Sequence, residues 1–374
     1  MATAVVNDLL QVKTIRDVVS RFDLHNTGIQ TILGMQPGGE NVTQAQSRKY
    51  QVDIFNDNAD VAPAVQAGGR SITVAEQPVG QYFVEVPQAV INVPLVYEKL
   101  NQYRPLGGPV STVDALGLKY YEAQLRSVAQ RIRNIREFQC AAMLRGSYTY
   151  TYSGDSLQQN FSGGTVTVDF QIPSGNKTQL NMLGGGNIVD ASWATASTDI
   201  PGHIGKVSAA FQQLTGGPLT DMIVTSVMWE NIKNNTNVRN QAGSANEPFL
   251  DQNRDPVTGL IKARIKSHPW VQIWCYDQGL NLGSGGTSNF SKLIADTACV
   301  FIARNSNGGR PRWNYADYFS PVVETYGGPA NNQLGEYFWS MTQPDPASIL
   351  LYGKMDGIPE LVVPKSIAYG TVVF

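Results

Sequence analysis

Apolar residues between positions 111 and 145 recur at alternating spacings of three and four, which places their side chains along one face of an α-helix. We therefore predict a single long helix over 111–145. Ser111 and Asp114 form a capping box at its start, and Gly146 suits a left-handed cap at its end. At about 1.5 Å per residue this helix spans roughly 50 Å, which suits a scaffold better than a pocket. The apolar stripe consists of Leu118, Tyr121, Leu125, Val128, Ile132 and Ile135.

The first 50 residues contain little that could form a core. One amphipathic helix is predicted over 12–22, and the sequence after it is polar and contains several glycines. A segment with so little apolar area cannot offset the entropy that it loses on ordering. We therefore expect an arm that packs against a neighbouring copy of the chain.

Residues 51–105 show the alternation typical of strands, with glycine and proline between the runs. The pattern predicts strands over 71–75 and 81–86, then an extended run from 90 to 96 that Pro94 breaks. A ribbon of so few strands is marginally stable in water, so we expect this segment to pack on another subunit too.

The remainder alternates between strands and helices, which predicts an α+β fold with an inserted α/β region. Residues 171–200 are expected to be mostly connecting sequence, and residues 237–259 an exposed polar loop. Helices are predicted over 204–214 and 227–235, and strands over 147–153, 165–170, 221–226, 271–276, 297–303, 337–342, 349–352, 361–363 and 371–374.

Composition supports a globular protein with a large area of uncharged polar surface. Apolar residues make up 42% of the 374 residues and charged residues only 16%, with a net charge of −2. Such a surface suits contact with other protein, because uncharged polar groups cost less to desolvate than ions. Three widely separated cysteines argue against a disulfide framework. We expect no secretory signal, no membrane span and no membrane partner.

The predicted long helix is locally basic. Residues 118–145 contain six basic side chains and two acidic ones. The simpler interpretation is a solvated helix face. The alternative is a surface that lies near nucleic acid without reading its sequence.

The chain carries no recognisable catalytic or metal-binding motif. Its three histidines are not at ligand spacing, and it has no nucleophile elbow, phosphate loop or dinucleotide fingerprint. Residues 251–262 resemble the opening of a calcium loop, but Pro256 replaces the required glycine and Lys262 the closing acid. We therefore expect no enzyme activity, no cofactor and no metal site.

The order of these parts resembles the major capsid proteins of tailed bacteriophages, which share the Hong Kong 97-type fold, and most closely the lambda-like E family. Three stretches carry the resemblance. They are the arginine-rich helix through Arg131–Glu137 into 144–151, the strand-to-helix unit Leu219–Trp229, and the closing segment Trp339–Leu351 with its Thr-Gln-Pro-Asp-Pro turn.

The resemblance implies five parts and a structural function. Residues 1–50 would be the N-terminal arm, 51–105 the extended β-loop, 106–200 the peripheral domain with its spine helix, 201–335 the axial domain, and 336–374 the returning C-terminal strands. The implied function is self-assembly, through hexamers and pentamers, into an icosahedral shell around double-stranded DNA. The protein would be part of the virion, assembled in the host cytoplasm. Portal, scaffold and decoration proteins are further partners that the resemblance suggests.

Two sets of residues follow from the resemblance. Arg126, Arg133 and Arg136 would lie near packaged DNA on the inner surface, or else would pair with carboxylates of a neighbouring subunit. The extended loop would contact the next subunit through Arg70, Glu76, Phe83 and Glu85. Alternative functions are the shell of a nanocompartment with protein cargo, and an enzyme or surface-binding protein of unrecognised type.

Overall fold

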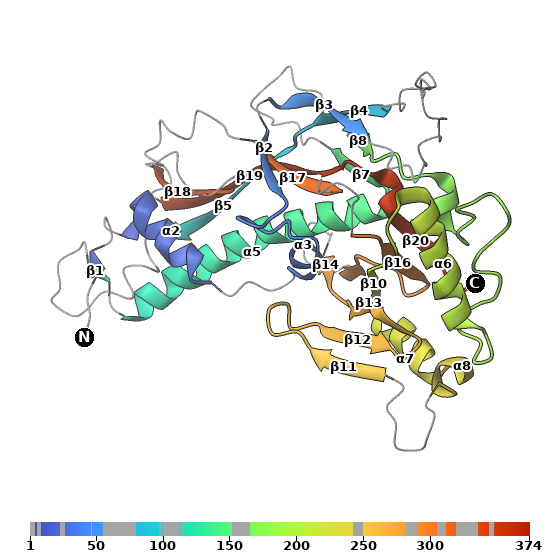
Figure 1. Ribbon diagram of the computed structural model, residues 1–374. Helices are drawn as coiled ribbons and strands as arrows, with labels where there is room; N and C mark the ends of the chain where they lie inside the picture. Colours follow the sequence, from blue (N-terminus) through green and yellow to red (C-terminus); the bar gives the residue numbers. More distant parts are fainter. Residues whose placement is uncertain are drawn as a thin grey trace, which may run out of the picture. The chain divides into compact units, whose positions relative to one another are not determined.

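The computed structural model describes residues 4–5, 9–22, 27–45, 47–54, 80–96, 99, 112–113, 115–151, 165–241, 250–281, 290–304, 312–318, 336–343 and 348–374. The chain forms two compact units, each built from segments that are distant in sequence. Both units combine helices with sheets, as predicted (Figure 1). Unit 1 comprises Met1–Lys49, Glu85–Gln139 and Tyr315–Pro359, and unit 2 comprises Tyr50–Val84, Cys140–Asn314 and Glu360–Phe374.

Helix α5 (Ala115–Arg145) confirms the predicted long helix (Figure 1). Most of its apolar stripe is buried: Tyr121, Leu125 and Val128 are each no more than 3% exposed, while Leu118 and Ile135 are partly buried. Gly146 ends the helix with a φ of 99°, and its N–H bonds to the carbonyl groups of the preceding turn. This is the left-handed cap that the sequence predicts.

The predicted start of this helix is wrong. Thr112–Val113 form a short strand, β6, which pairs antiparallel with β1 (Ala4–Val5). Because threonine and valine are β-branched, they favour extended backbone over a first helical turn. The capping pair Ser111 and Asp114 lies outside the described residues.

Unit 1 contains a five-stranded sheet around strand β19 (Ser348–Leu361). The same stretch of β19 pairs antiparallel with β18 (Glu336–Gln343) and with β5 (Gln88–Val96), so these two strands lie along its opposite edges. β17 (Trp313–Tyr318) pairs with β19 and, in parallel, with β2 (Val42–Ala45).

One face of this sheet packs against α5. Leu95 of β5, Phe338 of β18 and Leu351 of β19 share a core with the apolar stripe of the helix. Gly353 lies where a side chain could not fit, because an added Cβ would come within 2.5 Å of Val128. The helix and the sheet are therefore in direct contact along the stripe.

Pro94 does not interrupt the extended run, contrary to the prediction. It lies within β5, in register opposite Leu350 of β19. A sheet edge tolerates the missing N–H of proline, because no further strand needs that donor.

The packing surface that the N-terminal arm was expected to find on a neighbouring copy is supplied, for its described helices, by the same chain. Helix α2 (Val12–Ser20) buries Ile15 and Val19 in the same core as Tyr121 and Leu125 of α5. Helix α3 (Gly28–Ile32) and the turn after it bury Ile29, Leu33 and Met35 completely. The apolar stripe of α5 thus supplies, within the same chain, a surface for the arm.

Unit 2 is built on a seven-stranded sheet that is covered on one face by helices α6 (Ile200–Thr215) and α7 (Ser226–Asn234). Asp199 caps α6 through the N–H of Gly202, and Gly216 ends it with a φ of 69°. The strands run in the order β11 (Leu250–Arg254), β12 (Ile261–Ile265), β13 (His268–Cys275), β10 (Asp221–Val224), β16 (Ala298–Ile302), β20 (Ile367–Thr371) and β9 (Lys177–Thr178).

Two parts of unit 2 differ from prediction. The expected loop over 237–259 contains the end of helix α8 (Thr236–Arg239) and all of β11, a polar strand held by pairing with β12. β20 ends at Thr371, although the N–H groups of Val372 and Val373 still bond to the Thr297 carbonyl. Polar edge strands carry no apolar alternation, which explains why the pattern misses β11.

Smaller hairpins complete the described structure. The predicted strands after α5 are present as β7 (Ser147–Thr151) and β8 (Thr165–Asp169). β3 (Lys49–Ile54) pairs with β4 (Gly80–Glu85), and β14 (Gly279–Asn281) with β15 (Phe290–Lys292). The predicted strand over 71–75 lies outside the described residues. In the described part of the chain, no helix has both the length and the apolar character required to cross a bilayer.

Candidate functional site

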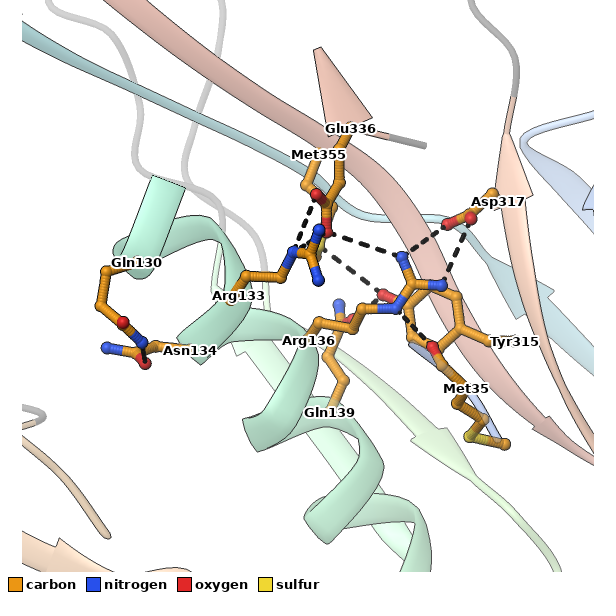
Figure 2. Close-up of polar contacts among 10 residues, drawn as sticks. All are labelled: Met35, Gln130, Arg133, Asn134, Arg136, Gln139, Tyr315, Asp317, Glu336 and Met355. Carbon is orange, nitrogen blue, oxygen red and sulfur yellow. Dashed lines mark hydrogen bonds and ion pairs between the residues drawn. The ribbon is translucent and has the colours of Figure 1, made fainter. Parts of the chain in front are cut away.

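Two basic residues of α5 form an ionic cluster inside unit 1 (Figure 2). Arg133 and Arg136 are three residues apart, so both side chains leave the same face of the helix. The acidic partners come from two strands, Asp317 of β17 and Glu336 of β18. The cluster therefore joins α5 to both strands.

Arg136 is the centre of this cluster and is completely buried. Its two terminal nitrogens lie 3.4 and 3.3 Å from the carboxylate oxygens of Asp317, and its Nε donates to the Met35 carbonyl at 2.7 Å. The guanidinium also lies 3.8 Å from the ring centroid of Tyr315. Contacts on the edge and the face of the guanidinium together hold it in one orientation.

The charges of the cluster balance. Glu336 is 2.9 Å from Arg133 Nε and 3.7 Å from Arg136 Nη1, so two guanidiniums face two carboxylates. Burial raises the pKa of Asp317 to about 7, and the neighbouring Glu336 adds to the rise while Arg136 opposes it. A buried ion pair costs several kcal/mol to desolvate, so each partner depends on the other.

A neutral hydrogen-bond network borders the ions. The Tyr315 hydroxyl donates to the side-chain oxygen of Gln139, whose NH₂ group donates to the Gly357 carbonyl at 3.2 Å. Figure 2 shows a separate bond between Gln130 and Asn134 along α5, at 2.8 Å. Because most of the cluster is buried and Arg136 also bonds to the Met35 carbonyl, the cluster has the features of a structural clamp.

The structure separates the three arginines proposed to lie near DNA. Arg136 is an internal residue, so a direct contact to phosphate is inconsistent with its burial. Arg133 is mostly covered and paired with Glu336. Arg126 is exposed, and its guanidinium lies 5.2 Å from the ring centroid of Phe22. The pattern of charges along the chain did not predict this difference in burial, because all three arginines belong to one basic helix.

The proposed extended-loop residues are only partly described. Arg70 and Glu76 lie outside the described residues. Phe83 of β4 is 79% exposed, which is unusual for an aromatic side chain, and Glu85 pairs with Lys49 at 3.2 Å. Phe83 is therefore the described loop residue with most to gain from contact with another molecule.

The sheet of unit 1 has a second face that the sequence analysis did not single out. Since side chains alternate along a strand, Val90, Tyr352, Trp339 and Met341 point away from the core shared with α5. Trp339 stacks on Tyr352 with the ring planes 3° apart, while Val90 and Met341 are 48% and 56% exposed. The alternation of Tyr337, Trp339 and Met341 along the sequence could have indicated this second apolar face.

The described residues contain no group of three or more histidine, cysteine, aspartate or glutamate side chains placed to hold a metal ion. The three cysteines are buried and unpaired by disulfides. The features that stand out are thus an internal clamp and exposed apolar surface.

Solved structures with the same arrangement of helices and strands are known. A crystal structure described as the putative capsid protein of a prophage from E. coli CFT073 aligns with a TM-score of 0.55 and 12% identity, covering 100% of both chains. A phage-related protein from Bordetella bronchiseptica RB50 aligns with a TM-score of 0.54 and 10% identity, covering 99% of this chain and 97% of that one. The fold expected from the resemblance, the Hong Kong 97-type capsid fold, is thereby confirmed.

A protein-family profile matches most of the chain. The profile of the family described as Phage major capsid protein E matches residues 33–372, and the chain belongs to that family. A search among curated proteins returns no match. The protein is a structural capsid protein, and the family match favours this function over the shell of a nanocompartment.

Proposed function

We propose that copies of this chain assemble through hexamers and pentamers into an icosahedral shell that encloses double-stranded DNA, without any catalytic step. The family match over residues 33–372 is the observation that carries this proposal. The exposed apolar face of unit 1 supports it, because exposed apolar surface of this kind commonly marks contact with another protein. Assembly would take place in the host cytoplasm, with portal, scaffold and decoration proteins as further partners.

The two units would take different places in the shell. Unit 1, which contains residues 115–139 of the spine helix, would be the peripheral domain, and the helix-covered sheet of unit 2 would be the axial domain. The predicted division at residue 200 differs from the partition of the chain, since residues 140–200 belong to unit 2. Residues 165–200 pack beside α6, with Leu180, Val189 and Trp193 in the core of unit 2.

Expression of the full chain followed by electron microscopy tests the assembly. Closed particles of uniform size are the expected result. A monodisperse monomer at high concentration in physiological salt, in the presence of the phage's other assembly proteins, would contradict the proposal. Nuclease-resistant DNA in particles from infected cells distinguishes a virion shell from a compartment that holds protein.

Within the shell, we assign Phe83 to the contact between subunits. Its ring is exposed on one face of the β3–β4 ribbon, while the side chains of Tyr82 and Val84 are buried on the other face. Insertion of the ring against an apolar surface of the next copy would remove it from water. Phe83→Ser should reduce particle yield and leave the melting temperature of the unassembled protein unchanged. Particle yield equal to wild type would refute the assignment.

The contact with DNA would be electrostatic and independent of sequence. Arg126, together with Lys119 and Arg131, which are also exposed on α5, remains available for phosphate. Arg126→Gln should lower the salt concentration at which filled particles lose DNA, because fewer counterions are released on binding. Arg239→Gln on α8 of unit 2 is the matched control. An unchanged salt dependence would exclude Arg126 from the contact.

A further inference from the structure

A histidine of unit 2 is buried between an indole and a carboxylate. His203, in the first turn of α6, is 3% exposed. Trp193 Nε1 donates to His203 Nδ1 at 3.0 Å, and Asp190 Oδ1 lies 2.8 Å from His203 Nε2. Because an indole N–H can only donate, Nδ1 must accept, and Nε2 carries the hydrogen that Asp190 accepts. The contacts therefore specify a neutral imidazole in one tautomer.

The indole belongs to a segment that links several parts of unit 2. Residues 188–199 form no helix or strand. The backbone N–H of Trp193 donates to the Val372 carbonyl at 2.8 Å, which joins the segment to the end of the sheet. Asn235, between α7 and α8, donates to the Thr198 carbonyl at 2.8 Å. The bond from the indole to the imidazole joins the middle of this segment to α6.

A second proton on the imidazole is incompatible with the indole bond. An imidazolium carries N–H groups on both ring nitrogens, so its Nδ1 would face the indole N–H of Trp193 as donor against donor. Trp193 is 1% exposed, and its ring packs edge-on against Phe301 of β16. A buried N–H group that loses its acceptor is costly. Protonation of His203 therefore favours displacement of Trp193 from this site.

The charged groups around the imidazole do not offset that loss. The side chain of Asp190 is 62% exposed, and ion pairs screened by water contribute little. The hydrogen bond and the charge of His203 lower the pKa of Asp190, so this carboxyl group stays ionised in mild acid. Asp199 is engaged in capping α6, and Lys206, three residues after His203, disfavours a second positive charge. The titratable group facing α6 from β13 is His268.

We propose that His203 is a proton-operated latch: the neutral imidazole holds Trp193 and its segment against α6, and uptake of a proton at Nδ1 releases them. Release would uncouple α6 from the end of the sheet without any covalent change. Histidine side chains change charge between pH 5 and pH 8, so a comparison of these two pH values tests the latch. The latch acts within unit 2 and does not depend on the proposed function.

The indole N–H of Trp193 is a direct probe of the latch. Unassembled protein labelled with ¹⁵N at tryptophan gives one indole signal for each of its six tryptophans, and Trp193→Phe identifies the signal of Trp193. Between pH 8 and pH 5 this signal should lose its hydrogen-bond shift. Its exchange with water, corrected for the intrinsic effect of pH, should become about ten-fold faster, because one buried hydrogen bond is lost.

Two histidine variants separate the latch from a general effect of acid. His203→Asn places a side-chain oxygen near the position of Nδ1 and cannot take up a proton, so the Trp193 signal should be the same at pH 8 and pH 5. His268→Asn is the matched control, since it removes the other histidine of unit 2 and should leave the pH response of Trp193 intact.

The outcomes decide the proposal in either direction. A Trp193 signal that keeps its shift and exchange rate from pH 8 to pH 5 would refute the latch. A pH response that persists in His203→Asn, or that disappears in His268→Asn, would refute it as well. If a variant fails to fold, the wild-type spectrum decides: loss of one hydrogen-bonded indole signal at pH 5 supports the latch, and six unchanged signals refute it.

Discussion

Removing the charge of Arg136 should destabilise unit 1 strongly and in a pH-dependent way. Arg136→Met keeps an unbranched side chain in the core but leaves Asp317, which is completely buried, without its direct ionic partner. Glu336 keeps its pairing with Arg133. Asp317 is therefore the group that determines the effect.

The magnitude follows from the burial of the pair. Removing one partner of a buried ion pair costs about 3–5 kcal/mol, because the remaining charge has lost its solvation without compensation. We expect this loss in the free energy of unfolding at pH 8. The pKa of Asp317 is already raised to about 7, and removal of the guanidinium raises it further. Because Asp317 is neutral at pH 5 in both proteins and wild-type Asp317 ionises only above about pH 7, that rise makes the loss at pH 5 smaller than the loss at pH 8 by at most about 1.4 kcal/mol.

Denaturant unfolding of unassembled protein, followed by circular dichroism at pH 5 and pH 8, measures both effects. Arg131→Met is the matched control, since Arg131 is exposed on the same helix and its loss should change stability by less than about 0.5 kcal/mol. Arg136→Met/Asp317→Leu removes both charges and should recover most of the loss. Equal stability of Arg136→Met and wild type at pH 8 would refute the clamp.

Three further predictions test the same core. The folded state holds the Asp317 proton up to about pH 7, whereas the unfolded state releases it near the ordinary aspartate pKa of 3.8. The contribution of Asp317 to stability therefore falls as pH rises toward 7, by at most about 4 kcal/mol. Asp317→Asn should remove that slope from a series of unfolding measurements at different pH. Glu137 accepts hydrogen bonds from two backbone N–H groups of α3, at 2.6 and 3.0 Å. Glu137→Gln should therefore lower the free energy of unfolding by about 1–2 kcal/mol and reduce the hydrogen-exchange protection of α3. Glu122→Gln, at an exposed position of α5, should do neither. Gly353→Ala should lower the stability measured by thermal unfolding by about 1–3 kcal/mol, because the added methyl group overpacks the contact with α5. Gly185→Ala, at a position with open space around it, should change stability little. Equal effects of the two substitutions would contradict the tight contact.

Local patterns in the sequence predicted the long helix and several other elements, but not α3, β2, β12 or β17. The three-and-four spacing on α5, the cap at Gly146 and the helix-strand-helix run through α6, β10 and α7 all depend on residues close together in the chain. Periodicity therefore predicted the spine helix and the core of unit 2. The polar strand β11 and the short strand at Thr112 were not predicted, because their conformation depends on pairing with another strand.

The candidate site depended on contacts that no local pattern contains. Arg126 and Arg136 have the same charge on the same helix, yet one is exposed and the other lies in the core. The partners that bury Arg136, Met35 and Asp317, are 101 and 181 residues away in the chain.

The sequence by itself thus determined many of the helices and strands and which family the chain resembles. The tertiary structure decided which charges are internal, where the arm packs and which apolar faces stay open. The physical reason is that burial depends on the segments that pack against a residue, and in this chain those segments come from distant parts of the sequence.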